Sequence, residues 1–196
     1  MKSFLVYCEG TSPLLMNRFI PEDERGDGEP RAPTVEELLH QDERGRIGLP
    51  VENLYASLVN AGKNVKHGGK PVSNGTSYLY DFLVIEGLFI PLVLREGLDI
   101  FLPVREWEVF PLPTPNGEKM IPMFSDWGFR VQFNLLENGV NVEILRQVVE
   151  TAGTRVGLGE RRVVHQGAYG RFRIVDWEEV EEIEGPAGME YIPPPT

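Results

Sequence analysis

A run of alternating residues in the second half of the chain sets the first constraint on the fold. Apolar side chains occupy every second position of this run, at Phe129, Val131, Phe133 and Leu135. A period of two is that of a strand with one buried face and one polar face. Such a strand needs neighbouring strands at its edges and a second layer over its apolar face, so the chain must build a covered sheet.

Two segments carry the helical spacing that supplies this layer. Apolar residues three and four positions apart predict a helix over 51–61, which begins after Pro50 and ends at Gly62. A second amphipathic pattern predicts a helix over 142–152, with Asn141 as its N-cap. Both helices therefore have an apolar face to bury against a sheet.

The remaining strands complete an antiparallel plan. β-rich runs predict strands at residues 3–8, 78–94, 100–112, 120–136 and 171–175. The order strand, helix, strand, strand, helix, strand predicts an α+β fold of the ferredoxin-like (RRM-like) type. In this plan an antiparallel sheet carries both helices on one face, and an extra β-hairpin is signalled here by Asn116 and Gly117. Four segments are expected in the sheet: Phe4–Tyr7, Leu83–Ile85, Phe129–Leu135 and Phe172–Ile174.

The chain is expected to form one domain followed by a tail. Residues 1–182 make up the single ferredoxin-like domain, with an insertion at about 20–46. Residues 183–196 form an acidic, proline-rich tail, and disorder or extended structure is expected after about Glu182. The tail contributes no strand or helix to the predicted domain.

The insertion is polar but contains one local structural signal. Thr34 and Glu37 have the spacing of a capping box, which predicts a short helix over 34–40. His40 lies in a charged neighbourhood at the end of this helix and is interpreted as a solvated residue.

The charge of the chain is unevenly distributed. The 196 residues carry a net charge of −11, but seven acids and no base follow position 175. Without that segment, residues 1–175 have a net charge of −4. The acidic total therefore does not exclude nucleic-acid binding, which depends on a local basic surface.

Composition also bears on cofactors and compartment. Cys8 is the only cysteine, so no intramolecular disulfide forms, and its place in a strand-like run predicts a buried side chain. No Cys/His cluster has metal-ligand spacing, so we expect neither a metal nor another cofactor. The sequence has no membrane-spanning apolar stretch and no signal-peptide pattern at its start. We therefore expect a cytoplasmic protein without membrane contact.

A positive, glycine-rich stretch between the second helix and the last strand is the strongest functional signal. Residues 152–174 contain five arginines, five glycines and a single acid, Glu160. Glycines let backbone amides approach an anion, and arginines donate in pairs to phosphate. The stretch is neither a Walker loop nor a dinucleotide-binding fingerprint. A long connection with solvated arginines is the alternative interpretation.

A second basic segment follows the first helix. Lys63, Lys66, His67 and Lys70 surround Gly68 and Gly69. Lysines near a helix C-terminus are also favoured by the helix dipole, so a solvated helix end explains this segment equally well.

Two of these segments resemble the RAMP superfamily of CRISPR systems. IGLPVENLYASLVNAG is similar to the entry of its first helix through Leu49 and Pro50, and GLGERRVVHQGAYGRFRI is similar to its glycine-rich loop. The glycine motif matches at Gly157, Gly159, Gly167 and Gly170. The resemblance covers roughly residues 3–16, 47–94 and 129–175. The chain is shorter than a CRISPR backbone subunit and lacks a basic body; similar small proteins occur among phage replication and recombination genes.

The resemblance and the basic loops together indicate a non-catalytic nucleic-acid-binding protein. The expected ligand is single-stranded DNA or RNA, in a phage or CRISPR-type context of replication, recombination or defence. The residues expected to contact it are Lys63, Lys66, Lys70, Arg155, Gly157, Gly159, Arg161, Arg162, His165, Gly167, Gly170 and Arg171. The acidic tail is expected to contact a protein partner, and a homo-oligomer is also considered.

Two alternatives stay open. The first is a structural or protein-interaction subunit of a phage assembly, in which the tail is an assembly arm and the arginines form salt bridges. The second follows from the resemblance, because some RAMP proteins cleave RNA with a histidine-based general acid and base. His67 and His165 lie in the two basic loops and are the residues for such a pair.

Overall fold

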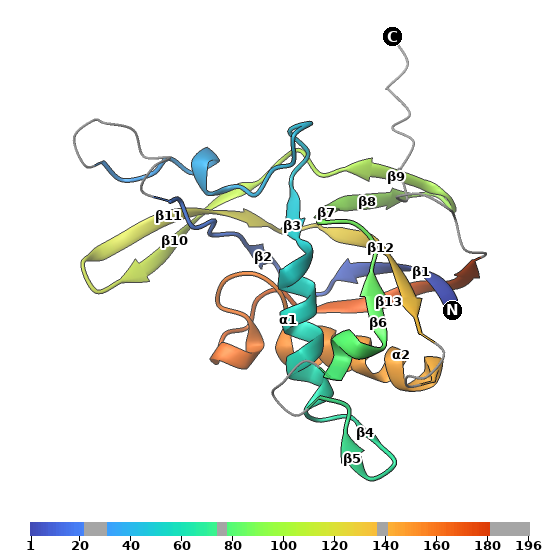
Figure 1. Ribbon diagram of the computed structural model, residues 1–196. Coiled ribbons are helices and arrows are strands. Elements are labelled where there is room, and N and C mark those ends of the chain that lie inside the picture. The colour runs from blue at the N-terminus through green and yellow to red at the C-terminus, as the bar shows by residue number, and fades with distance from the viewer. Residues whose placement is uncertain (22–30, 74–77, 137–140, 181–196) are drawn as a thin grey trace.

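The computed structural model describes residues 1–21, 31–73, 78–136 and 141–180 (Figure 1). Within these ranges the protein is α+β, with two α-helices and strands that pair antiparallel throughout the named sheets. Neither helix in the described part of the chain is long and apolar enough to cross a membrane. The expected tail and the segment 22–30 of the insertion lie outside the described residues, so the domain boundary at residue 182 stays a prediction.

The central sheet has four strands in the order β13-β1-β12-β6. Their bounds are Phe172–Val180 for β13, Lys2–Gly10 for β1, Gly128–Leu135 for β12 and Leu83–Ile85 for β6. β1 pairs with β12 along one edge and with β13 along the other. All four segments expected in one antiparallel sheet are therefore confirmed.

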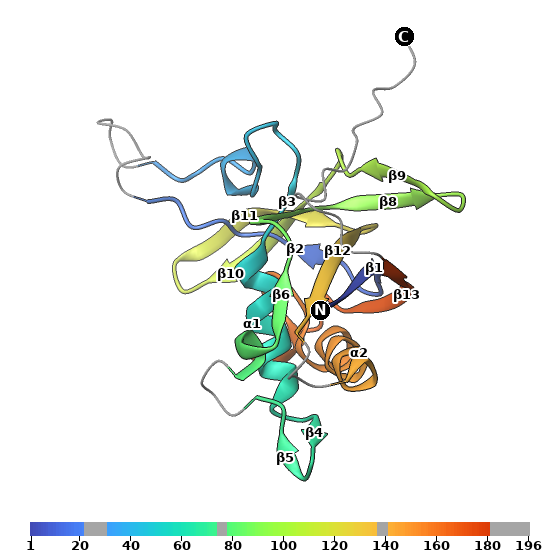
Figure 2. The same cartoon turned by 45° about the vertical axis from the view of Figure 1, so that its right-hand side comes forward.

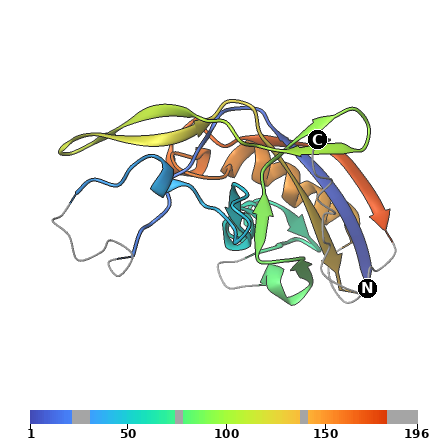
Figure 3. The ribbon, with the colours of Figure 1, turned by 90° about the horizontal axis from the view of Figure 1, so that it is seen from above.

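Both helices pack into the core that this sheet forms. α1 (Val51–Gly62) and α2 (Val142–Thr151) touch each other and lie beside the sheet (Figure 3). Their buried residues join one apolar cluster with Phe4, Val6 and Cys8 of β1. Burial raises the pKa of the Cys8 thiol, as expected of a side chain that serves as a small core residue. Asn141 caps α2, because its side-chain oxygen accepts a hydrogen bond from the Ile144 amide.

A long hairpin extends from this core. β10 (Glu108–Thr114) and β11 (Gly117–Phe124) form the hairpin, and β2 (Leu14–Leu15) pairs with its base (Figure 1). The predicted turn is confirmed, with Pro115 and Asn116 as the connecting residues. A second, smaller core lies under the hairpin and contains Leu15, Leu38, Leu112 and Ile121.

Three short two-stranded pairs complete the fold. They are β3 (Gly48–Pro50) with β7 (Phe89–Pro91), β4 (Lys66–His67) with β5 (Lys70–Pro71), and β8 (Val93–Glu96) with β9 (Ile100–Pro103). The expected strand over 78–94 is thus divided into β6, β7 and β8. Gly87 interrupts it with a φ of 85°. The first residues of that segment, Tyr78–Asp81, form a 3-10 helix (η3), which corrects the strand prediction there.

The last strand is longer than predicted. β13 continues to Val180 instead of ending near Val175. Its register with β1 shifts between Tyr7 and Cys8, and this bulge returns Trp177 to the core face. The Trp177 ring lies 5.7 Å from the ring of Phe4 and 6.1 Å from that of Phe133. Packing of one tryptophan therefore keeps an acidic segment in the sheet.

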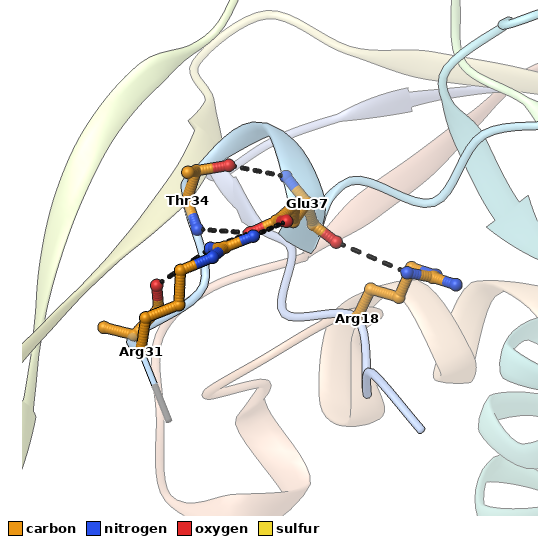
Figure 4. A network of polar contacts seen from close by, with 5 residues as sticks. Arg18, Arg31, Thr34 and Glu37 are labelled. Atoms are coloured by element: carbon orange, nitrogen blue, oxygen red, sulfur yellow. Dashed lines mark hydrogen bonds and ion pairs between the residues drawn. The ribbon is translucent and has the colours of Figure 1, made fainter. Parts of the chain in front are cut away.

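The capping box in the insertion is confirmed. The Thr34 amide donates to Glu37 Oε2 at 2.7 Å, and the Glu37 amide donates to Thr34 Oγ1 at 3.3 Å (Figure 4). The helix it begins is a 3-10 turn, η2 (Glu36–Leu38), shorter than the predicted 34–40. Leu38 and Leu39 are buried, so this part of the insertion is fixed to the protein.

The Glu37 carboxylate has a testable pH signature. The guanidinium of Arg31 and the Thr34 amide lower the pKa of Glu37 from 4.5 to about 2. A depressed pKa stabilises the folded insertion above pH 4.5, and this contribution is lost as the pH falls through about 2. We predict that Arg31→Ala raises the Glu37 pKa toward 4.5, measured by carboxyl NMR titration. Arg44→Ala, an exposed arginine elsewhere in the insertion, should leave it unchanged; equal midpoints in both variants would contradict the assignment.

Candidate nucleic-acid interface

The glycine-rich loop (residues 157–170) is positioned by the end of α2. The helix continues into η4 (Ala152–Val156), a short π-helical turn, and the Gly157 amide closes it by donating to Ala152 O at 2.7 Å. Ser57 of α1 then donates its hydroxyl to Gly157 O at 3.0 Å in the protein interior. The start of the loop is therefore fixed against the middle of α1.

Backbone hydrogen bonds hold the rest of the loop on the segment that follows β1. The Glu160 amide donates to Leu15 O and the Gly170 amide donates to Pro13 O, both at 2.8 Å. The Leu158 amide donates to Gly170 O at 2.9 Å and closes the loop on itself. Many of its amides are thus occupied by the protein's own carbonyl oxygens, and the side chains are what the loop presents outward.

Two of the motif glycines are required by close packing. Gly159 and Gly170 have φ angles of 74° and 69°, which L-residues rarely adopt. A Cβ at Gly159 would overlap Leu15 O, and one at Gly170 would overlap Leu158 O. Gly167 is half-buried in the same loop and donates its amide to Arg162 O at 3.2 Å. The fold alone accounts for these glycines, and anion contact by their amides stays a prediction.

The arginines of this region are directed to solvent. Arg155, Arg161 and Arg171 are exposed, and none of them forms an ion pair with a carboxylate in the part of the chain that the structure describes. The acid of the loop, Glu160, accepts a hydrogen bond from Asn17 Nδ2 at 3.1 Å instead. The region therefore displays positive charge that its own surroundings leave unneutralised.

The long hairpin adjoins the loop, which the sequence did not indicate. The rings of Phe110 and Tyr169 meet edge to face at 5.4 Å, and Arg161 Nη2 donates to Pro113 O at 3.3 Å. Lys119 of β11 donates to Asn17 Oδ1 at 2.7 Å beneath the same region. The loop and the hairpin base thus form one continuous surface.

The lysine segment is in a different place. Figures 1 and 2 both show β4 and β5 beyond the C-terminal end of α1, whereas the loop contacts the helix near Asn53 and Ser57. Lys63, Lys66 and Lys70 are exposed there. At 1.5 Å per residue, the 12 residues of α1 span about 18 Å, so the two basic groups are separated by much of a helix length.

The same separation applies to the two histidines of the endoribonuclease alternative. His67 lies in β4, and His165 lies in η5 (Val163–His165) within the loop. Both side chains are exposed. No contact joins these histidines, so the geometry gives no support to an acid and base pair formed by them.

A small polar pocket beside the loop was not predicted. It has a volume of about 150 Å³ and is lined in part by Asn53, Glu160, Arg162 and His40. Arg162 Nε is buried there without a hydrogen-bond partner among the described residues. Burial and the charge of Arg18 lower the pKa of His40, which favours its neutral form. His40 is half-buried rather than solvated, and only the folded insertion reveals this position.

Comparison with known proteins gives little further information. No family model and no curated protein matches the sequence. One similar solved structure is a chain of the Type III-B Cmr-beta complex bound to cognate target RNA, with a TM-score of 0.48 and 12% identity. The match covers 92% of this chain and 61% of that chain, so this protein spans about three fifths of its length. Both similarity values are too low to assign a fold or a function. In the described residues, no group of three acidic, histidine or cysteine side chains could hold a metal ion.

The close approach at Gly159 can be tested against a matched glycine. Gly97, in the β8–β9 turn, has a φ of 75° but open space at its Cβ position. Gly97→Ala should cost about 1–2 kcal/mol of unfolding free energy, the strain of a left-handed residue. Gly159→Ala should cost about 1–3 kcal/mol more, because Leu15 must also move. Urea unfolding measures both, and equal losses would show that the loop does not depend on this contact.

Proposed function

We propose that this protein binds single-stranded nucleic acid without cleaving it, through the arginines around the glycine-rich loop. One observation carries the proposal: Arg155, Arg161 and Arg171 are exposed and have no described ion-pair partner, although acids outnumber bases 30 to 19. A guanidinium matches a phosphate group bidentately, and a nucleic-acid backbone supplies such groups at regular intervals.

Other arginines of the protein support this interpretation by contrast. Arg31, Arg46, Arg95, Arg146 and Arg173 each form an ion pair with a carboxylate. An acidic surface thus neutralises most of the cations that it can reach. The loop arginines escape this because their backbone is seated among uncharged carbonyl oxygens, and an external anion is the remaining source of a partner.

The overall charge favours a single strand over a duplex. A rigid duplex would bring many phosphates against an acidic protein surface, at a cost in electrostatic energy. A flexible strand can follow a local basic surface and leave the acidic regions. We extend the proposed path along α1 to Lys63, Lys66 and Lys70, about 18 Å away, which a strand of several nucleotides would cover.

We also infer a distant relationship to the RAMP superfamily and a ferredoxin-like plan. The sheet order β13-β1-β12-β6 is the order expected when two strand–helix–strand units interleave, and the glycine-rich loop precedes the final strand. A phage or CRISPR-type role in replication, recombination or defence follows from this relationship. A fold serves many functions, so the binding proposal depends on the arginines and not on this inference.

Binding is tested with fluorescein-labelled oligo-dT and oligo-U, by anisotropy over a series of salt concentrations. Wild-type affinity should fall steeply with salt, because phosphate contacts release counterions. Arg161→Ala/Arg171→Ala should weaken binding and reduce the slope by about 1.4, at about 0.7 per lost contact to a single strand. Unfolding free energy should change by less than about 0.5 kcal/mol per substitution, since both residues are exposed.

The matched control is Lys2→Ala/Arg146→Ala, which removes the same charge away from the loop. Lys2 pairs with Glu179 and Arg146 with Glu150, so neither cation is free for a ligand. The control should keep the wild-type salt slope. Equal slopes in both double variants would remove the loop from the interface. An absence of binding at low salt would favour the structural or protein-interaction subunit instead.

A further inference from the structure

The β8–β9 hairpin covers part of the sheet face that α1 and α2 leave open. Phe101 packs edge to face on Tyr7 at 4.9 Å, and the Arg130 guanidinium lies 4.8 Å from the centre of the Phe101 ring. Arg95 forms an ion pair with Asp176 at 3.2 Å. One face of the hairpin is therefore fixed to the sheet by aromatic and charged contacts.

A groove opens beside this hairpin. Its volume is about 800 Å³, within the usual range of binding sites. Apolar and aromatic side chains make up much of its lining, including Tyr7, Leu94, Leu102, Val104 and Trp107. The groove is thus wide and apolar enough to receive side chains of another molecule.

The outward face of the hairpin continues the apolar lining of the groove. Leu94 and Leu102 are cross-strand partners, and Ile100 follows on the same face with 58% of its surface exposed. Leu98 at the turn is 80% exposed. These side chains do not attach the hairpin to the sheet, and a contiguous exposed apolar surface of this kind marks an interaction site.

The charges around the groove identify its occupant. Five carboxylates line it, from Glu9, Glu96, Glu106, Glu108 and Asp126, against the guanidinium groups of Arg95 and Arg105. Arg95 is already paired with Asp176. The groove is therefore net negative, which excludes a nucleic-acid backbone and favours lysine or arginine.

We propose that this groove and the outward face of the hairpin bind a cationic amphipathic segment of a partner protein. Its apolar side chains would cover Leu94, Ile100 and Leu102, and its basic side chains would meet the carboxylates at the rim. The residues after Val180 are acidic and without bases, so the same charges repel them. A second copy docking through the same face would oppose identical carboxylates.

The probe is a fluorescein-labelled peptide of alternating leucine and lysine, titrated against the full chain. Trp107 is half-buried in the groove, so its fluorescence should change on binding, and Trp107→Phe should remove that change. Peptides with serine in place of leucine, or glutamate in place of lysine, should bind far more weakly. These comparisons separate the apolar and charged contributions.

Matched variants separate the groove from general attraction to an acidic protein. Leu94→Thr/Leu102→Thr should weaken peptide binding about tenfold, whereas Val109→Thr/Met120→Thr, equally exposed on the β10–β11 hairpin, should not. Glu106→Gln/Asp126→Asn should weaken it more than Glu43→Gln/Glu143→Gln, which removes the same charge elsewhere. Each pair contains exposed residues, so folding should be retained.

Three results would overturn the proposal. Equal losses in groove and control variants would show only non-specific attraction. Sedimentation of a wild-type dimer that Leu94→Thr/Leu102→Thr dissociates would make a second copy the occupant. Faster amide exchange in β8–β9 on removal of residues 181–196 would assign the face to the chain's own C-terminal segment.

Discussion

The pairing of β1 on both of its edges is the interaction on which the rest of the structure depends. β1 joins β12 on one side and β13 on the other, so it connects the first residues of the chain to the last described ones. Its alternation then divides the molecule. Phe4, Val6 and Cys8 face the helices, while Tyr7 and Glu9 face the groove. These contacts are far apart in sequence, so the sheet closes only after most of the chain is in place.

The two proposed interfaces differ in how their charge is arranged. Around the glycine-rich loop, backbone carbonyl oxygens of Pro13 and Leu15 occupy amides, and the guanidinium groups are left to solvent. Around the groove, carboxylates surround an apolar floor, and Arg95 is held by Asp176. One surface repels what the other attracts. A nucleic-acid strand and a cationic protein segment would therefore not compete for the same place on this protein.

Local patterns were sufficient wherever the structure is determined by neighbours in sequence. The alternation of residues 129–135 gave β12, and Asn141 gave the start of α2. The sequence failed where distant residues decide. Trp177 extends β13 because it packs on rings from two other strands, and Tyr78–Asp81 is a 3-10 turn despite a β-rich composition. For the candidate site, the loop and its arginines were predictable from composition, whereas the pocket around His40 requires the insertion to fold back on the loop.

The seating of the loop on backbone atoms has a consequence for how this surface can change over time. Folding restricts Gly159 and Gly170, because carbonyl oxygens occupy the space that a side chain would need. The exposed positions between and beside them carry no such restriction. Mutation can therefore alter the number and placement of charges at Arg155, Arg161 and Arg171 with little effect on stability. A loop of this construction can acquire a new ligand preference without first losing its shape.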